Sequence, residues 1–272
     1  TNVSQVTDLS VVNATTTSAY ALNVIYTAGT ATGLRIEQDT GCDGYDTLVY
    51  NNALSVPASP YSVSGLTANT GYKFQVYVYN SGADLNPDSA PETSEITTPP
   101  AQPTSLTSSA ADYTSITWDW DNVVGADSYN IYLSDNTLVG SSGTSDYVQD
   151  SLNPNTQYNV FVRAVNSNGI SIASNTAGTY TDASVPTGLG HTSQAVDSVR
   201  WTWSSGGGQK DYYARSDMPA NSGWIVDEYW DESGLTANNL ITTYVKARNE
   251  DLDETVESNI ARYTSQNTPT GL

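Results

Sequence analysis

Two groups of side chains in this chain have the chemistry to bind a ligand, and the first is acidic. Asp39, Asp43 and Asp46 lie in the segment DTGCDGYD, whose glycines favour a tight turn. Clustered carboxylate oxygens are ligands that Ca²⁺ prefers, although this spacing does not match the EF-hand loop. The segment therefore predicts either a solvated acidic turn or a calcium site. A similar but weaker acidic group lies in NEDLDETVES: Glu250, Asp251, Asp253 and Glu254.

The second group is aromatic. Trp224 and Tyr229 lie in GWIVDEYWDESG, and Tyr212 lies a short distance before them. Exposed aromatic rings near carboxylates can stack on sugar rings or contact a partner chain. The alternative is that this part of the chain packs its core, or an interdomain contact, with larger side chains.

Other reactive groups are sparse. His191 is the only histidine, so a histidine-based triad has one possible base, and the glycine-rich segment SSGGGQK favours a flexible loop between strands. Cys42 is either a free thiol or an intermolecular link, and Asn2 and Asn13 fit the glycosylation sequon. No paired carboxylates, nucleophile with a base, or phosphate loop occurs in a fitting context, so we expect no enzyme activity and no obligatory cofactor.

The charge of the chain excludes some partners. It carries 29 acidic and 9 basic residues, a formal net charge of −20. Such a field repels nucleic acid and anionic membranes. No run of 18 apolar residues occurs, so we also expect no direct insertion into a membrane.

The elements that must position these residues come from an internal repeat. Equivalent starts are separated by 97, 83 and 83 residues, at Leu9, Leu106, Leu189 and Leu272. A second leucine in each copy is followed fourteen residues later by an asparagine, and the pairs are Leu66 and Asn80, Leu152 and Asn166, and Leu235 and Asn249. A period of this size indicates modular architecture. We predict domains at 1–98 (with an insertion in its first half), 99–183 and 184–267, and the start of a further repeat at 268–272.

Within each copy, apolar and polar residues alternate with a period of two, which is typical of half-buried strands. Ile116, Trp118 and Trp120 alternate onto one face, which predicts a core strand. We expect their counterparts to be Val199, Trp201 and Trp203 in the third copy, and Leu22, Val24 and Tyr26 in the first. A bulky aromatic residue also lies five residues before each second leucine, at Tyr61, Tyr147 and Trp230.

These residues resemble the fibronectin type III domain. The resemblance rests on the tryptophan-ending second strand, on the leucine, turn and tyrosine of LTANTGY and LNPNTQY, and on the long alternating strand after them. It implies that Tyr72 and Tyr158 are tyrosine corners, which pin the turn between strands E and F. The third copy has Ile241 there, so we expect its E–F turn to be less firmly held. The implied fold is all-β, with three tandem seven-stranded immunoglobulin-like sandwiches.

Short linkers containing proline, TTPPAQPTSL and TDASVPTGL, predict an elongated, semi-rigid rod. Together with the resemblance, the acidic, lysine-poor surface implies a prokaryotic protein located outside the cell or at its surface. We therefore expect a non-catalytic spacer, adhesive or assembly segment whose partners are other repeats of the same protein and possible surface proteins or glycans. The alternatives are a carbohydrate-binding or accessory region of a secreted polysaccharide-degrading enzyme, and a phage-tail or host-attachment adhesin.

Overall fold

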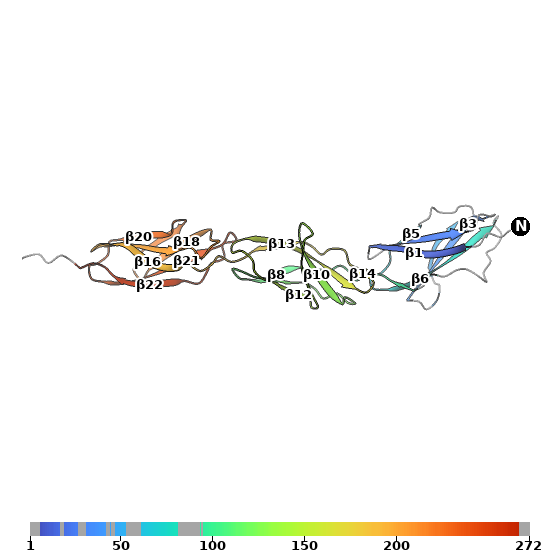
Figure 1. Ribbon diagram of the computed structural model, residues 1–272, viewed down its shortest axis with the longest axis horizontal. Coiled ribbons are helices and arrows are strands. Elements are labelled where there is room, and N and C mark those ends of the chain that lie inside the picture. Colours follow the sequence, from blue (N-terminus) through green and yellow to red (C-terminus); the bar gives the residue numbers. More distant parts are fainter. Residues whose placement is uncertain are drawn as a thin grey trace, which may run out of the picture.

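The computed structural model describes residues 6–16, 19–26, 31–41, 44, 47–52, 61–80, 93 and 95–266. Within these ranges every regular element is a β-strand, which confirms the all-β prediction. These ranges contain no helix with the length and apolar character needed to cross a membrane. The strands form three sandwiches that lie end to end along the long axis of the molecule (Figure 1).

Each sandwich has a sheet of three strands and a larger sheet that faces it. The first contains β1 (Val6–Thr16), β2 (Ala19–Tyr26), β3 (Ala31–Thr40), β4 (Thr47–Asn52), β5 (Tyr61–Ser64), β6 (Gly71–Asn80) and β7 (Ile96–Thr97). The second contains β8 (Thr107–Ala111), β9 (Ile116–Asp119), β10 (Ser128–Leu133), β11 (Leu138–Ser142), β12 (Asp146–Gln149), β13 (Gln157–Asn166), β14 (Gly169–Ile170) and β15 (Ala177–Tyr180). The third contains β16 (Thr187–Gln194), β17 (Ser198–Ser204), β18 (Asp211–Ser216), β19 (Asn221–Ile225), β20 (Tyr229–Ser233), β21 (Leu240–Arg248) and β22 (Ser258–Tyr263).

The three sandwiches share one strand order. The smaller sheets are β1-β2-β5, β8-β9-β12 and β16-β17-β20, and the larger ones begin β4-β3-β6, β11-β10-β13 and β19-β18-β21. In the second sandwich the last strand is divided into β14 and β15. Between them, the hydroxyls of Ser171 and Ser174 accept hydrogen bonds from the backbone N–H groups of Ala164 and Val162, each at 2.9 Å. Side chains thus replace part of the backbone ladder.

Large aromatic side chains fill the cores of the second and third sandwiches. Trp120 meets Tyr129 edge to face with ring centroids 5.2 Å apart, and Trp203 meets Tyr212 in the same way at 5.5 Å. Such edge contacts add about 0.5–1.5 kcal/mol beyond the burial of apolar surface. The repeated pair fixes the distance between the two sheets at one end of each core.

The pairing of strands corrects the predicted alignment of the first copy. Leu22 lies opposite Tyr61, as Trp118 lies opposite Tyr147 and Trp201 opposite Trp230. Leu22 is therefore the counterpart of Trp118, and the predicted match with Ile116 is wrong by two residues. A shift of two residues keeps every side chain on the same face, so alternation alone cannot detect it.

The predicted tyrosine corners are confirmed. The hydroxyl of Tyr72 accepts a hydrogen bond from the N–H of Thr67 at 2.8 Å, and that of Tyr158 accepts one from the N–H of Asn153 at 3.1 Å. In the third sandwich Ile241 is fully buried at this position. Its side chain fills the space without a polar group to hold the turn.

A buried threonine that the sequence patterns do not reveal holds the E–F turn in all three sandwiches, that is, the turn from β5 to β6, from β12 to β13 and from β20 to β21. The hydroxyl of Thr181 accepts from the N–H of Thr156 at 3.0 Å and donates to the carbonyl of Asn153 at 2.6 Å. Thr98 makes the same pair of bonds to Thr70 and Thr67, and Thr264 makes it to Asn239 and Thr236. The third turn therefore keeps this clamp although it lacks the tyrosine. The expectation that it is less firmly held stays a prediction.

We predict that Thr264→Val destabilises the third sandwich by about 1 kcal/mol, because the isosteric side chain cannot make the two hydrogen bonds to the N–H of Asn239 and the carbonyl of Thr236. Native-state hydrogen exchange of the amides in β21 measures this change. The control is Thr242→Val on the outer face of the same strand. Equal protection of β21 in the two variants would show that the clamp contributes nothing.

Candidate functional site

The junctions between sandwiches are built on an asparagine in each E–F turn. Asn69, Asn155 and Asn238 have φ of 50°, 44° and 54°, a left-handed conformation that asparagine tolerates better than most residues. Each donates its backbone N–H to a carbonyl just after the buried threonine, at Pro99, Asp182 and Ser265, over 3.0, 3.1 and 3.2 Å. The turn is thereby tied to the segment that follows the last strand of its own sandwich.

The side chains of two of these asparagines cross to the next sandwich. The side-chain oxygen of Asn69 accepts from the amide of Asn166 at 3.2 Å, and that of Asn155 accepts from the backbone N–H of Glu250 at 2.8 Å. Asn166 ends β13, and Glu250 follows Asn249 in the loop after β21. Both junctions therefore join the E–F turn of one sandwich to the region between the last two strands of the next. The fixed position of Asn166 and Asn249 in the repeat is the sequence signal that marks these contact regions. By itself the spacing predicts the repeat and not the contact.

Glycines in the B–C loops, which follow β9 and β17, allow the sandwiches to approach closely. A Cβ on Gly125 would lie 1.9 Å from the side-chain nitrogen of Asn69, and one on Gly208 would lie 2.4 Å from the carbonyl oxygen of Pro154. Both glycines also have positive φ, 77° and 65°. The segment SSGGGQK was expected to be a flexible loop, and the structure instead places Gly208 against the preceding sandwich. The contact between Gly208 and Pro154 joins two separate sandwiches, so the sequence of one loop does not predict it.

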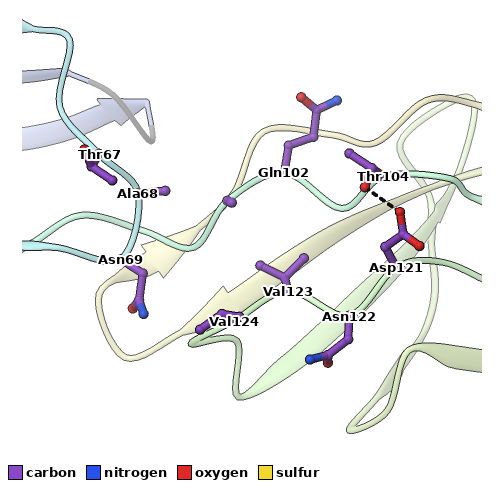
Figure 2. Close-up of a pocket in the computed structure, with 10 residues that line it drawn as sticks. Thr67, Ala68, Asn69, Gln102, Thr104, Asp121, Asn122, Val123 and Val124 are labelled. Atoms are coloured by element: carbon purple, nitrogen blue, oxygen red, sulfur yellow. Dashed lines mark hydrogen bonds between the residues drawn. The ribbon is translucent and has the colours of Figure 1, made fainter.

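A cavity of about 460 Å³ lies at the first junction (Figure 2). Its walls are the E–F turn at 67–69, the linker residues Ala101, Gln102 and Thr104, and the B–C loop at 121–124. Asp121 is the one charged residue among these, and it accepts hydrogen bonds from the hydroxyls of Ser105 and Thr104 at 2.6 and 2.8 Å. These bonds lower the pKa of Asp121. One oxygen of its carboxylate ties the linker to the B–C loop.

The second junction brings carboxylates together. The pKa of Asp182 is raised, first by burial and then by the negative charges of Asp253 and Asp112. The backbone N–H of Asp182 donates to the carbonyl of Asp112 at 3.1 Å, which holds the two residues side by side. Repulsion between these carboxylates therefore destabilises the junction, and it weakens when Asp182 is protonated.

The predicted calcium residues are only partly described. Asp39 is 4% exposed and accepts a hydrogen bond from the N–H of Gly44 at 3.1 Å. Asn13 lies in β1, where only the backbone is described. Among the residues that the structure describes, no group of three or more His, Cys, Asp or Glu side chains is placed to hold a metal ion. The calcium site stays a prediction, since Asp43 and Asp46 lie outside the described ranges. Cys42 and the sequon residue Asn2 also lie outside them.

The second acidic group is described, and its carboxylates point to separate partners. Glu254 pairs with Lys246, and Glu250 lies 3.2 Å from the ammonium group of Lys210. Asp251 accepts a hydrogen bond from the backbone N–H of Tyr180 in the second sandwich at 3.4 Å. These residues stabilise loops and the junction and do not converge on one point.

The structure separates the three predicted aromatic residues. Tyr212 is 1% exposed, and burial raises its pKa to about 12. Its assignment to an exposed binding surface is wrong, because alternation along β18 turns Tyr212 to the core and Tyr213 outward. Tyr229 is 39% exposed, but it lies in β20 of the other sheet, where Arg200 covers its ring at 4.3 Å.

Trp224 is partly exposed on the outer face of the larger sheet of the third sandwich. Its ring lies 5.5 Å from that of Tyr213, and the guanidinium carbon of Arg248 lies 4.0 Å from its centroid. On the same face Arg215 lies 4.2 Å over the ring of Tyr244. We call this surface the aromatic–cation face, and its members are Tyr213, Arg215, Trp224, Tyr244, Lys246 and Arg248.

Comparison with known proteins gives one family match and several relatives. Residues 101–179 match the family model for the fibronectin type III domain. Exoglucanase B of Cellulomonas fimi is 28% identical over 239 residues, which is 77% of this chain. Chitinase A1 of Niallia circulans is 32% identical over 160 residues, or 53% of this chain. The chain spans only 22% of the length of each of these relatives.

Solved structures include similar arrays. A two-domain fibronectin type III segment of chicken tenascin is 12% identical, with a TM-score of 0.45, and the match covers 60% of this chain and 99% of that one. The FN1-FN3 domains of chicken CNTN1 are 17% identical, with a TM-score of 0.32, and the match covers 95% of this chain and 98% of that one.

We predict that Asp182→Asn raises the thermal unfolding midpoint at pH 7. The folded-state pKa of Asp182 is raised, so its charged form opposes folding above that pKa, and the penalty fades as pH falls towards the usual value of about 3.9. Thermal unfolding of the parent and the variant at pH 7 and below about pH 3.9 measures the effect. The difference in midpoint should disappear at the lower pH. The exposed Asp150→Asn is the matched control, and an equal gain in both variants would contradict a specific role for the junction.

Proposed function

Because residues 101–179 are a fibronectin type III domain and the sandwiches on either side share its strand order, we propose that this chain is a non-catalytic, semi-rigid spacer of an extracellular or cell-surface bacterial protein. The observation that carries the proposal is the repetition of one junction. At both boundaries an E–F turn asparagine and a B–C loop glycine make the contact. A flexible linker would not need such matched surfaces.

The linkers support the same function. Pro99, Pro100, Pro103 and Pro186 are buried, so the linkers pack against the sandwiches and do not extend freely into solvent. A Cβ on Gly169, in the second sandwich, would lie 3.2 Å from the ring of Pro99, which places that ring against the hairpin after β13. Fixed proline backbone and packed rings both restrict rotation between neighbouring sandwiches. The net charge of −20 keeps such rods apart.

A second function is favoured by the relatives. Exoglucanase B and Chitinase A1 are named for polysaccharide degradation, and this chain resembles about a fifth of each. The same spacer would then be an accessory region that sets the distance between a catalytic domain and another part of a secreted enzyme. Fibronectin type III domains are generally non-catalytic, and this role needs no reactive group in the segment.

The spacer proposal is tested by Asn155→Ala, which removes the bond to Glu250. We expect a broader distribution of distances between spin labels on the second and third sandwiches, introduced at Val148→Cys and Ser233→Cys in a Cys42→Ser background. Asn238→Ala is the matched control, because it makes the same change in a turn that has no partner sandwich within the described residues. Equal distributions in the parent and in Asn155→Ala would argue against a semi-rigid junction.

The accessory role is tested with a longer polypeptide that contains these 272 residues. If it is a polysaccharide-degrading enzyme, deleting residues 1–272 should slow hydrolysis of an insoluble polymer severalfold and leave hydrolysis of a soluble oligosaccharide unchanged. A parent without hydrolase activity would exclude this role and leave the spacer proposal intact.

A further inference from the structure

We propose that the aromatic–cation face of the third sandwich binds a neutral polysaccharide chain, with Trp224 as the stacking platform. This inference is independent of the spacer function, because a rod can be stiff whether or not one face binds a glycan. It concerns the outer face of the larger sheet, on strands β19, β18 and β21, and β21 leads into the loop that forms the second junction.

The position of Trp224 provides the platform. Trp224 lies on the edge strand β19, and Arg248 lies on β21, with β18 between them. The guanidinium carbon of Arg248 lies 4.0 Å from the centroid of the indole ring, and the ammonium nitrogen of Lys246 lies 5.7 Å from it, so these side chains meet over the outer face of the sheet. The indole therefore lies over the sheet with Arg248 against one side. Trp224 is partly exposed, so part of its ring is available to the apolar C–H face of a sugar ring.

The hydrogen-bonding groups around the ring suit sugar hydroxyls. Arg248 makes two bonds to Asp211, at 2.6 and 2.8 Å, and Arg215 makes two to Glu257, at 2.8 and 2.7 Å. A guanidinium has five N–H donors and a carboxylate has about four acceptor positions, so each pair keeps both donors and acceptors in reserve. Their side chains are held in place and partly exposed, between 13% and 41%.

Charge balance selects a neutral glycan over an acidic one. The three cations of the face pair with three carboxylates: Arg248 with Asp211, Arg215 with Glu257, and Lys246 with Glu254. The face is thus close to neutral, while the whole chain carries −20. A polyanion would gain no local attraction and would meet the repulsion of the rest of the molecule.

The second sandwich provides an internal comparison. Asn130 pairs with Ser141 and Arg163 there, as Tyr213 pairs with Trp224 and Lys246 in the third sandwich. The two rings at the centre of the aromatic–cation face are therefore replaced by an amide and a hydroxyl. The second sandwich has a stacked Tyr132–Phe161 pair elsewhere on this face, so the difference between the two copies is the pair of rings at Tyr213 and Trp224.

The test is retention of the 272-residue chain on insoluble cellulose and chitin, with soluble polygalacturonate as the acidic probe. We expect binding to a neutral polymer, and binding roughly tenfold weaker for Trp224→Ala, a loss equivalent to about 1.4 kcal/mol. Trp224→Tyr keeps a ring and should restore part of the affinity. Tyr229→Ala, an exposed aromatic residue on the opposite sheet, is the matched control.

Several outcomes would overturn the proposal. One is that the parent chain is retained on neither neutral polymer, or that it binds polygalacturonate alone. Another is that Trp224→Ala is retained as well as the parent, or that Tyr229→Ala loses as much binding as Trp224→Ala. Thermal unfolding of each variant separates lost binding from lost folding, and Trp224→Tyr provides the comparison if Trp224→Ala fails to fold. Failure of binding would leave the distances between the sandwiches, and so the spacer function, unaffected.

Discussion

The buried threonine hydroxyl at the end of each sandwich is the interaction on which the array depends. Thr181 closes the E–F turn of the second sandwich through one accepted and one donated hydrogen bond. The same turn holds Asn155 in its left-handed conformation, and Asn155 contacts the next sandwich. One hydroxyl thus links the closure of a domain to the geometry of the junction. Its loss would remove two hydrogen bonds from the turn, which matters in a small domain of marginal stability.

The two faces of each larger sheet have separate roles. Inward residues such as Tyr212 and Ile241 pack the core, where burial is nearly complete. Outward residues vary between copies, and in the third sandwich they form the aromatic–cation face. Because strand side chains alternate with a period of two, a copy can gain a surface without disturbing its core. A repeated domain can therefore keep one framework and carry a different surface in each copy.

The buried acceptor for the core tryptophan is a glutamine in the second sandwich and a glutamate in the third. Trp118 donates from its indole nitrogen to Gln149 at 3.0 Å, and Trp201 donates in the same way to Glu232 at 2.8 Å. Glu232 is 2% exposed and also accepts a hydrogen bond from the hydroxyl of Ser216. A buried carboxylic group is acceptable here because donors surround it. The shared feature is an acceptor for the indole N–H.

The sequence by itself determined the fold and the module count, because alternation and the repeat period are local patterns. It also identified the tyrosine corners at Tyr72 and Tyr158, and it selected Trp224 as unusual. It could not fix the register of Leu22, since a shift of two residues preserves the face. It also gave no reason to place Tyr212 in the core and Tyr213 outside.

Only the tertiary structure decided the junctions and the position of Trp224 over Arg248. Asn69 and Gly125 are far apart in the chain and become partners when two folded sandwiches meet. Such contacts depend on the relative placement of whole modules, and no local pattern encodes that placement.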